Sequence, residues 1–221
     1  MKYIMLLLSA LMGIMLSSAL PVNDDTFNPL ANATIVDIKW IVPISANRTD
    51  TVFGTIEDVA RHLSVVAPER FAADKNSIYD GVTTAPLPDH ADISHSTRDD
   101  SDGMYDAGEY SCGVYDPARG RPIKEGIDML RKVTGQPVLD PNTCSRVSCS
   151  WNSAILWCNF SDHPLTLDGF GRIADGAKDL MNSCAFIPDD SNTNDFFFSG
   201  NQVFGKEHVN EWWTTVMQNS C

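Results

Sequence analysis

The six cysteines of this 221-residue chain all lie between Cys112 and Cys221, and they constrain its fold more than any other feature. Their number is even, and paired disulfides are the default use of such cysteines in an oxidising compartment. Zinc is the competing use, but Cys144-x4-Cys149 and Cys149-x8-Cys158 form no CxxC knuckle and have no His pair nearby. We therefore predict a disulfide-stapled C-terminal region without a metal site or a cofactor.

The first residues predict export. Lys2 supplies a short positive region, an apolar run covers 4–16, and small residues precede a cleavage position after Ala19. The run is too short for a membrane span, so a signal peptide over 1–19 is favoured over an N-terminal anchor. No later apolar stretch approaches the length of a span, and we expect no membrane insertion in the mature chain.

Sequons and charge indicate what the exported chain carries on its surface. Three N-glycosylation sequons begin at Asn32, Asn47 and Asn159. The chain holds 16 Lys and Arg residues against 29 Asp and Glu residues, for a formal net charge of −13. Such a chain is repelled by phosphate backbones, so we expect no nucleic-acid partner.

Composition divides the chain after the signal peptide. Residues 20–85 form an acidic segment without cysteine, either a pro-segment or a strand and a helix that dock elsewhere. Residues 86–111 are rich in Pro, Ser, Asp and Gly and lack apolar periodicity, which is typical of a linker. Residues 112–221 hold every cysteine and form the predicted disulfide-rich domain.

The acidic segment contains two predicted elements. Apolar alternation over 34–45 predicts a strand that stops at Pro43. Residues 55–63 predict a helix that Thr55 caps, with one apolar face. A strand and a helix of this size bury too little surface to be stable alone. They therefore dock on the cysteine-rich domain or stay loosely ordered.

The cysteine-rich region alternates predicted strands and helices. Helices are expected over 122–133 and 167–184, the second capped by Asp168. Five strands are expected over 110–115, 146–151, 154–158, 196–204 and 211–217, the second and third joined by a turn at Asn152-Ser153. The order β-α-β-β-α-β-β predicts an α+β fold: a mostly antiparallel sheet with two helices on one face.

No catalytic constellation stands out. The histidines are His62, His90, His95, His163 and His208, and neither HExxH nor GxSxG occurs. The acidic pairs lie in Ser-, Asn- or Pro-rich stretches, whereas a glycosidase needs two carboxylates on separate rigid elements. We predict a protein that is not an enzyme, with a secreted hydrolase as one alternative.

The block CSRVSCSWNSAILWCN over 144–159 is the most distinctive motif of the chain. GIDMLR, IADGAK, GNQVF and cysteines 184 and 221 accompany it. Together these features resemble small secreted proteins of filamentous fungi, many from plant-associated species. Their architecture is similar to that of the smut virus killer toxin and of the necrosis-inducing extracellular-protein effectors. The resemblance covers 112–221 and does not reach 20–111.

The resemblance implies a disulfide pairing, an architecture and a function. The implied pairs are Cys112–Cys184, Cys149–Cys158 and Cys144–Cys221, in a killer-toxin-like sandwich. The implied function is that of a secreted, non-enzymatic effector or virulence factor that binds a host or cell-surface protein or glycan. A killer-toxin-like inhibitor of a membrane channel or of a competing microbe is the first alternative, although this chain lacks the additional cysteines of the smut toxin. A structural cell-surface protein is a further alternative.

Aromatic side chains near the predicted strands are the candidate contact residues. An exposed aromatic residue on a rigid scaffold suits protein or glycan contact, and packing in the core is the alternative for each. Neighbours in a strand face opposite sides, so one of the adjacent pair at 212 and 213 is expected in the core. The candidates are Trp151, Trp157, Trp212, Trp213 and Arg146.

Overall fold

The computed structural model describes residues 30, 33–69, 79, 82–84, 107–188, 195–206 and 209–221. The signal peptide, Asn32 and most of the predicted linker lie outside the described residues, as do His90, His95 and His208.

A six-stranded sheet forms the centre of the fold, in the order β1-β8-β9-β13-β12-β5. Neighbouring strands are antiparallel except β1, which runs parallel to β8. Its strands are β1 (Thr34–Val36), β8 (Thr143–Ser150), β9 (Ser153–Asn159), β13 (Val209–Gln218), β12 (Gly200–Lys206) and β5 (Ala107–Cys112). Because β5 begins at Ala107, the last residues of the predicted linker belong to this sheet.

Three smaller sheets accompany the central one. A three-stranded sheet has the order β3-β2-β4, and two short pairs are β10-β7 and β11-β6. Their strands are β2 (Ile38–Ser45), β3 (Arg48–Gly54), β4 (Thr83–Thr84), β6 (Ala118–Arg119), β7 (Val138–Leu139), β10 (Leu165–Thr166) and β11 (Phe197–Phe198). The predicted strand stop at Pro43 is wrong, because β2 continues through Pro43 to Ser45.

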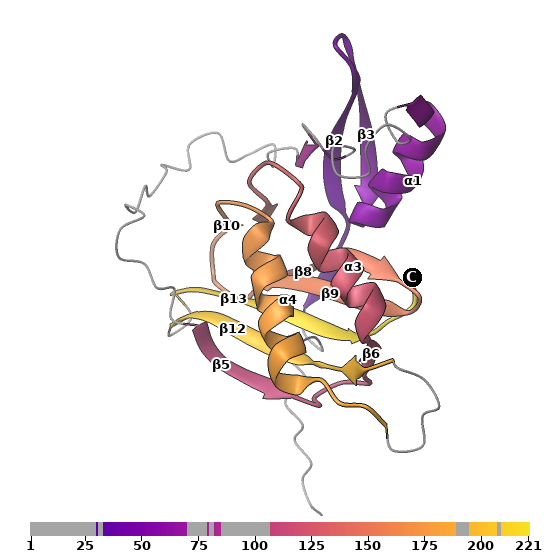
Figure 1. Ribbon diagram of the computed structural model, residues 1–221. Coiled ribbons are helices and arrows are strands. Elements are labelled where there is room, and N and C mark those ends of the chain that lie inside the picture. Colours follow the sequence, from indigo (N-terminus) through magenta and orange to yellow (C-terminus); the bar gives the residue numbers. More distant parts are fainter. Residues whose placement is uncertain are drawn as a thin grey trace, which may run out of the picture.

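Helices α3 (Gly120–Leu130) and α4 (Gly171–Cys184) lie side by side on one face of the central sheet, and α1 (Ile56–Val66) lies beside the β2-β3 hairpin (Figure 1). The described residues thus confirm an α+β fold with a mostly antiparallel sheet and two helices on one face. In α3, buried Ile123, Ile127 and Leu130 recur at helical spacing and face the sheet. The predicted cap of α4 is wrong: Phe170 is the N-cap, while Asp168 pairs with Arg172 at 3.2 Å.

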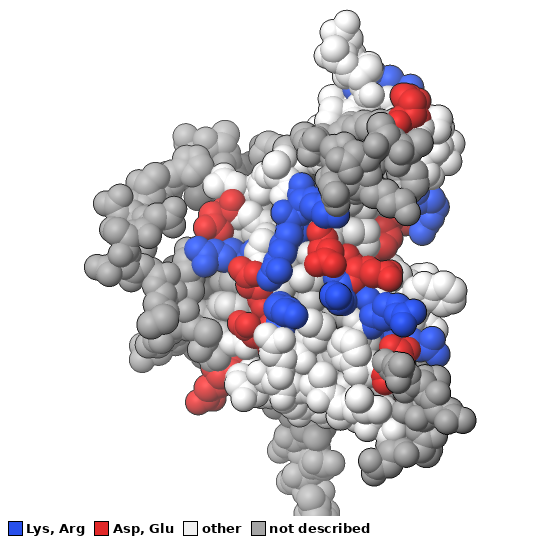
Figure 2. All heavy atoms as spheres, in the orientation of Figure 1, with Lys and Arg blue, Asp and Glu red and all other residues white. Residues whose placement is uncertain are grey.

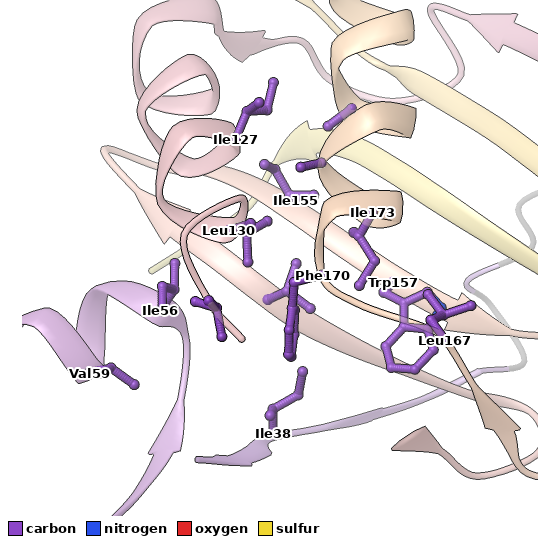
Figure 3. Packing of buried hydrophobic residues seen from close by; sticks show 14 of the residues in the cluster. Ile38, Ile56, Val59, Ile127, Leu130, Ile155, Trp157, Leu167, Phe170 and Ile173 are labelled. Carbon is purple, nitrogen blue, oxygen red and sulfur yellow. The ribbon is translucent and has the colours of Figure 1, made fainter. Parts of the chain in front are cut away.

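The cysteine-free segment shares its core with the cysteine-rich region. Figure 3 shows Ile38 pointing toward Phe170 and Ile56 lying on the side of Leu130, and Val59 of α1 belongs to the same cluster. The indole of Trp40 stacks on the Phe170 ring, with centroids 4.9 Å apart. Of the two outcomes expected for the segment, the structure shows docking.

Three disulfides link Cys112 to Cys184, Cys144 to Cys158 and Cys149 to Cys221. The first agrees with the pairing that the resemblance implies, and the other two differ from it. Cys149–Cys158 would require a hairpin turn centred between residues 153 and 154. The turn instead lies at residues 151 and 152, which sets Cys144 directly opposite Cys158 and Cys149 opposite Ala154.

Three disulfides are compatible with an extracellular protein. Among the described residues, no helix is both long enough and apolar enough to cross a membrane.

Candidate contact site

The tip of the β8-β9 hairpin combines exposure with an unusual backbone. Its two turn residues, Trp151 and Asn152, have φ angles of 51° and 55°. Positive φ at both central residues is the signature of a type I′ turn, which usually carries Asn or Gly. A bulky residue in this left-handed region costs about 1–2 kcal/mol. The Trp151 side chain is nevertheless 76% exposed, so little packing offsets that cost.

Hydrogen bonds brace the turn from two sides. The hydroxyl of Ser153 accepts from the backbone N–H of Arg119 at 3.0 Å and donates to the carbonyl of Trp151 at 3.3 Å. On the other side, the backbone N–H of Asn219 donates to the carbonyl of Asn152 at 3.2 Å. The turn is therefore held by the start of α3 and by the segment that follows β13.

Arg146, the fifth predicted contact residue, reinforces that second brace. Its Nη1 donates to Asn219 Oδ1 at 3.1 Å and to the carbonyl of Ser220 at 2.6 Å. The Cys149–Cys221 disulfide ties the same segment to β8. Arg146 is half-buried and holds residues 219–221 in place, so its visible role is structural.

Helix α1 supports the hairpin below the turn. The Glu57 carboxylate accepts from Ser148 Oγ at 2.5 Å and from the Cys149 backbone N–H at 2.9 Å. Both donors directly follow Val147, where the β8-β9 register shifts. The Glu57 carboxylate thus accepts hydrogen bonds from two donors at the register shift of β8. These bonds join the cysteine-free segment to the β8-β9 hairpin.

The other predicted aromatic contacts are buried. Trp157 is fully buried among the residues under the helices. Trp212 packs on Phe204 on the helix side, with ring centroids 4.0 Å apart. Trp212 thus lies in the core, as expected for one of the adjacent pair, and Trp213 packs on the opposite face, near Phe160, so neither is exposed. Both faces of the sheet are covered by apolar side chains at this point, so Trp151 is the one exposed residue among the four tryptophans predicted as contacts.

Two sequons fall on described residues and differ sharply. Asn47 is exposed in the turn between β2 and β3, where a glycan fits. Asn159 is fully buried, and its Nδ2 donates to the carbonyls of Leu139 and His163, both at 2.9 Å. A glycan on that nitrogen would displace these bonds, so the expected glycosylation of Asn159 is incompatible with the fold. Asn159 is instead the centre of a buried polar network that also includes Ser161.

Each histidine in the described part of the chain lies beside an aspartate. His62 Nε2 lies 2.9 Å from Asp50 Oδ2, and Arg48 Nη2 lies 2.8 Å from the same oxygen. The hydrogen bond from Arg48, followed by that from His62, lowers the pKa of Asp50. His163 Nδ1 lies 2.8 Å from Asp162 Oδ1, and this bond lowers the pKa of Asp162. No hydrogen bond joins His62 to a hydroxyl or thiol group in the described part of the chain.

The described residues contain no group of three or more His, Cys, Asp or Glu side chains that could hold a metal ion.

The sequence identified Trp151 as a contact candidate but did not identify the residues that position it. The predicted turn at Asn152-Ser153 makes Ser153 a turn residue and gives Arg119 no role in holding the turn. Placing the turn one residue earlier leaves Ser153 as the first residue of β9, beside α3. Comparison of the chain with protein-family models, curated proteins and solved structures found no match.

Proposed function

We propose that this chain is a secreted, non-enzymatic, effector-like protein that binds a host or cell-surface target through Trp151. The observation that carries the proposal is a largely exposed indole held in a costly backbone conformation by a braced two-residue turn. Local rules of stability are commonly broken at functional sites, where selection preserves the side chain rather than the fold. Trp is also enriched among residues that dominate binding energy at interfaces.

The rigidity of the turn supports binding rather than incidental exposure. Two hydrogen-bonded braces and a nearby disulfide restrain the tip, so little backbone freedom is lost when Trp151 meets a partner. A preorganised aromatic side chain supplies a large contact area at low entropic cost.

Secretion and a killer-toxin-like sandwich belong to the same proposal. Three disulfides support an oxidising compartment. Two helices on one face of an antiparallel sheet, together with Cys112–Cys184, support the resemblance in architecture.

Replacing Trp151 with Asn tests the proposal, because Asn tolerates left-handed backbone. The variant should fold and gain up to about 1 kcal/mol in free energy of unfolding, since the steric cost is relieved. Purified disulfide-intact protein would be infiltrated into leaves of a panel of plants, with cell-surface retention and tissue response as readouts. We expect wild-type retention and at least tenfold weaker retention of the Trp151→Asn variant.

Phe53→Ser is the matched control, because Phe53 is also an exposed aromatic residue, at 61%. It should leave both readouts unchanged. Equal retention of wild type and Trp151→Asn would overturn the assignment of Trp151. Turnover of polysaccharide or peptide substrates by the purified protein would overturn the non-enzymatic assignment.

A further inference from the structure

Three exposed cationic residues lie at the start of α3, where the backbone of Arg119 holds the Trp151 turn. Arg119 is the N-cap of α3 and donates its backbone N–H to Ser153, which in turn bonds the Trp151 carbonyl. Arg121 and Lys124 follow in the first turns of the helix and are exposed. Figure 2 shows that Lys and Arg side chains gather with Asp and Glu over the helix-covered face.

The pairing of these arginines differs from that of the other arginines. Four described arginines form ion pairs: Arg48 with Asp50, Arg61 with Asp58, Arg131 with Asp175 and Arg172 with Asp168. Arg146 donates to Asn219 and Ser220. Within the described part of the chain, Arg119 and Arg121 are the arginines whose guanidinium groups have no such partner.

Leaving these two groups unpaired is notable in a chain with a net charge of −13. Carboxylates are plentiful, yet none lies in the first turn of α3. Asp116 and Glu125 are exposed in the same stretch and do not pair with either arginine. Free guanidinium groups suit bidentate bonds to carboxylates supplied by another molecule.

From this geometry we propose that Trp151, Arg119 and Arg121 form one contact surface for a short acidic peptide segment of a partner protein. The indole of Trp151 packs against an apolar side chain of the segment, and the two guanidinium groups bind the carboxylates of flanking Asp or Glu residues. This inference rests on the proposed function, since it assigns the chemistry of the target that Trp151 contacts.

Charge favours a short segment over a long acidic polysaccharide. A polyanion that extends across the molecule meets the field of a chain with net charge −13, which repels it. A short segment interacts mainly with groups within a Debye length, about 8–10 Å at physiological ionic strength. Over that range the stretch 116–125 holds three cationic residues and two acidic ones, so its local charge is positive although the charge of the chain is negative.

Selection from a random peptide display library on the immobilised full chain tests this chemistry. We expect selected sequences with an apolar residue flanked by Asp or Glu, whose affinity falls as salt concentration rises. Replacing both arginines, Arg119→Gln with Arg121→Gln, should weaken the selected peptides by about tenfold or more per arginine. The control pair Lys39→Gln with Lys178→Gln changes the net charge equally and should leave affinity within about twofold.

The outcomes separate this inference from the proposed function. Loss of cell-surface retention in Trp151→Asn, with peptide binding unaffected by the arginine replacements, overturns the inference and leaves the proposed function standing. Selected sequences without acidic enrichment also overturn it. So does tight binding of polygalacturonate or heparin by the same surface with no peptide selected. Retention and peptide affinity that depend on neither Trp151 nor the arginines overturn both.

Discussion

Within the described part of the chain, the cysteine-free region up to residue 84 and the cysteine-rich region from residue 107 are held in place by different means. All three disulfides lie within the second region, and none crosses to the first. The first region is attached by apolar packing around Trp40, by the pairing of β1 with β8 and by the Glu57 carboxylate. The two regions therefore differ in cysteine content but share one hydrophobic core.

The difference shows what each kind of linkage contributes. Disulfides stabilise a fold mainly by lowering the conformational entropy of the unfolded chain between the two cysteines. Burial marks where the folded state is stabilised, and one apolar cluster extends from Ile38 to Val216 across both regions. The cysteine-rich region is therefore expected to depend on the segment that precedes it.

The largest expected effect follows from Trp40→Ala, which tests whether the regions share one core. Removing the indole leaves a cavity beside Phe170 and deletes the Nε1 hydrogen bond to the Gly54 carbonyl. We expect a loss of about 3–5 kcal/mol in the free energy of unfolding, measured by denaturant titration. Fluorescence and circular dichroism should report one shared transition. Phe53→Ala is the exposed control, and an early transition confined to the cysteine-free segment would show that the regions are independent.

Removing disulfides should have the next largest effect and should differ between pairs. Cys112–Cys184 spans 72 residues and Cys144–Cys158 spans 14. Their double replacement by Ser should cost about 4 and about 3 kcal/mol respectively in the chain-entropy model. Thermal unfolding of the two variants measures the difference, and equal losses would contradict loop closure as the cause.

Non-reducing tryptic mapping checks the connectivity itself, because Arg146 lies between Cys144 and Cys149. The observed pairs join fragments 133–146, 147–172 and 207–221 in one species. The pairing implied by the resemblance would leave fragment 147–172 separate.

Replacing Glu57 by Ala probes the polar link between the regions. The Ser148 hydroxyl and the Cys149 N–H would lose their shared acceptor at the register shift of β8. We expect a loss of about 1.5–3 kcal/mol, the range for hydrogen bonds to a charged group. Amide hydrogen exchange at Cys149 should accelerate more than exchange in the middle of β9. An unchanged exchange rate at the Cys149 amide would show that the Glu57 carboxylate does not support the hairpin.

The smallest expected effect concerns the pH dependence of α1. Burial disfavours the Asp58 carboxylate, but bonds from the Thr55 backbone N–H and hydroxyl and from Arg61 outweigh it and lower its pKa below 3.8. Its contribution is therefore complete above the ordinary pKa and is lost as pH falls through the lowered value. Asp58→Ala should cost about 1 kcal/mol at pH 7. The difference from wild type should shrink below pH 4 in urea titrations, and a constant difference down to pH 2 would contradict this account.

Much of the fold was predictable because local signals and packing agree. The apolar spacing of Ile123, Ile127 and Leu130 predicted α3, and Thr55 predicted the start of α1. The parallel pairing of β1 with β8 was not predictable, since three residues at the edge of a sheet carry no signal of their distant partner. The cap of α4 was misplaced because Asp168 forms an ion pair with Arg172 instead of capping the helix.

The sequence predicted the main residue of the candidate site, but it did not predict the backbone conformation of that residue or the hydrogen bonds that hold it. An aromatic residue beside a predicted hairpin indicated Trp151, whereas its positive φ depends on the turn register. The same register decides which cysteines face each other, and it excludes the Cys149–Cys158 pair that the resemblance implies. Strand alternation predicts that Trp212 and Trp213 face opposite sides of the sheet, but it does not predict that both sides are covered.

The order of strands in the central sheet has a consequence for how the chain matures. Strand β13 comes last of the six in the sequence, yet it lies between β9 and β12. Until it is available, β1-β8-β9 and β12-β5 remain two fragments with exposed edges, which invite pairing with other chains. Assembly of the sheet therefore waits for the last strand to be synthesised, and a chain shortened before Val209 would be prone to aggregate rather than form a smaller domain.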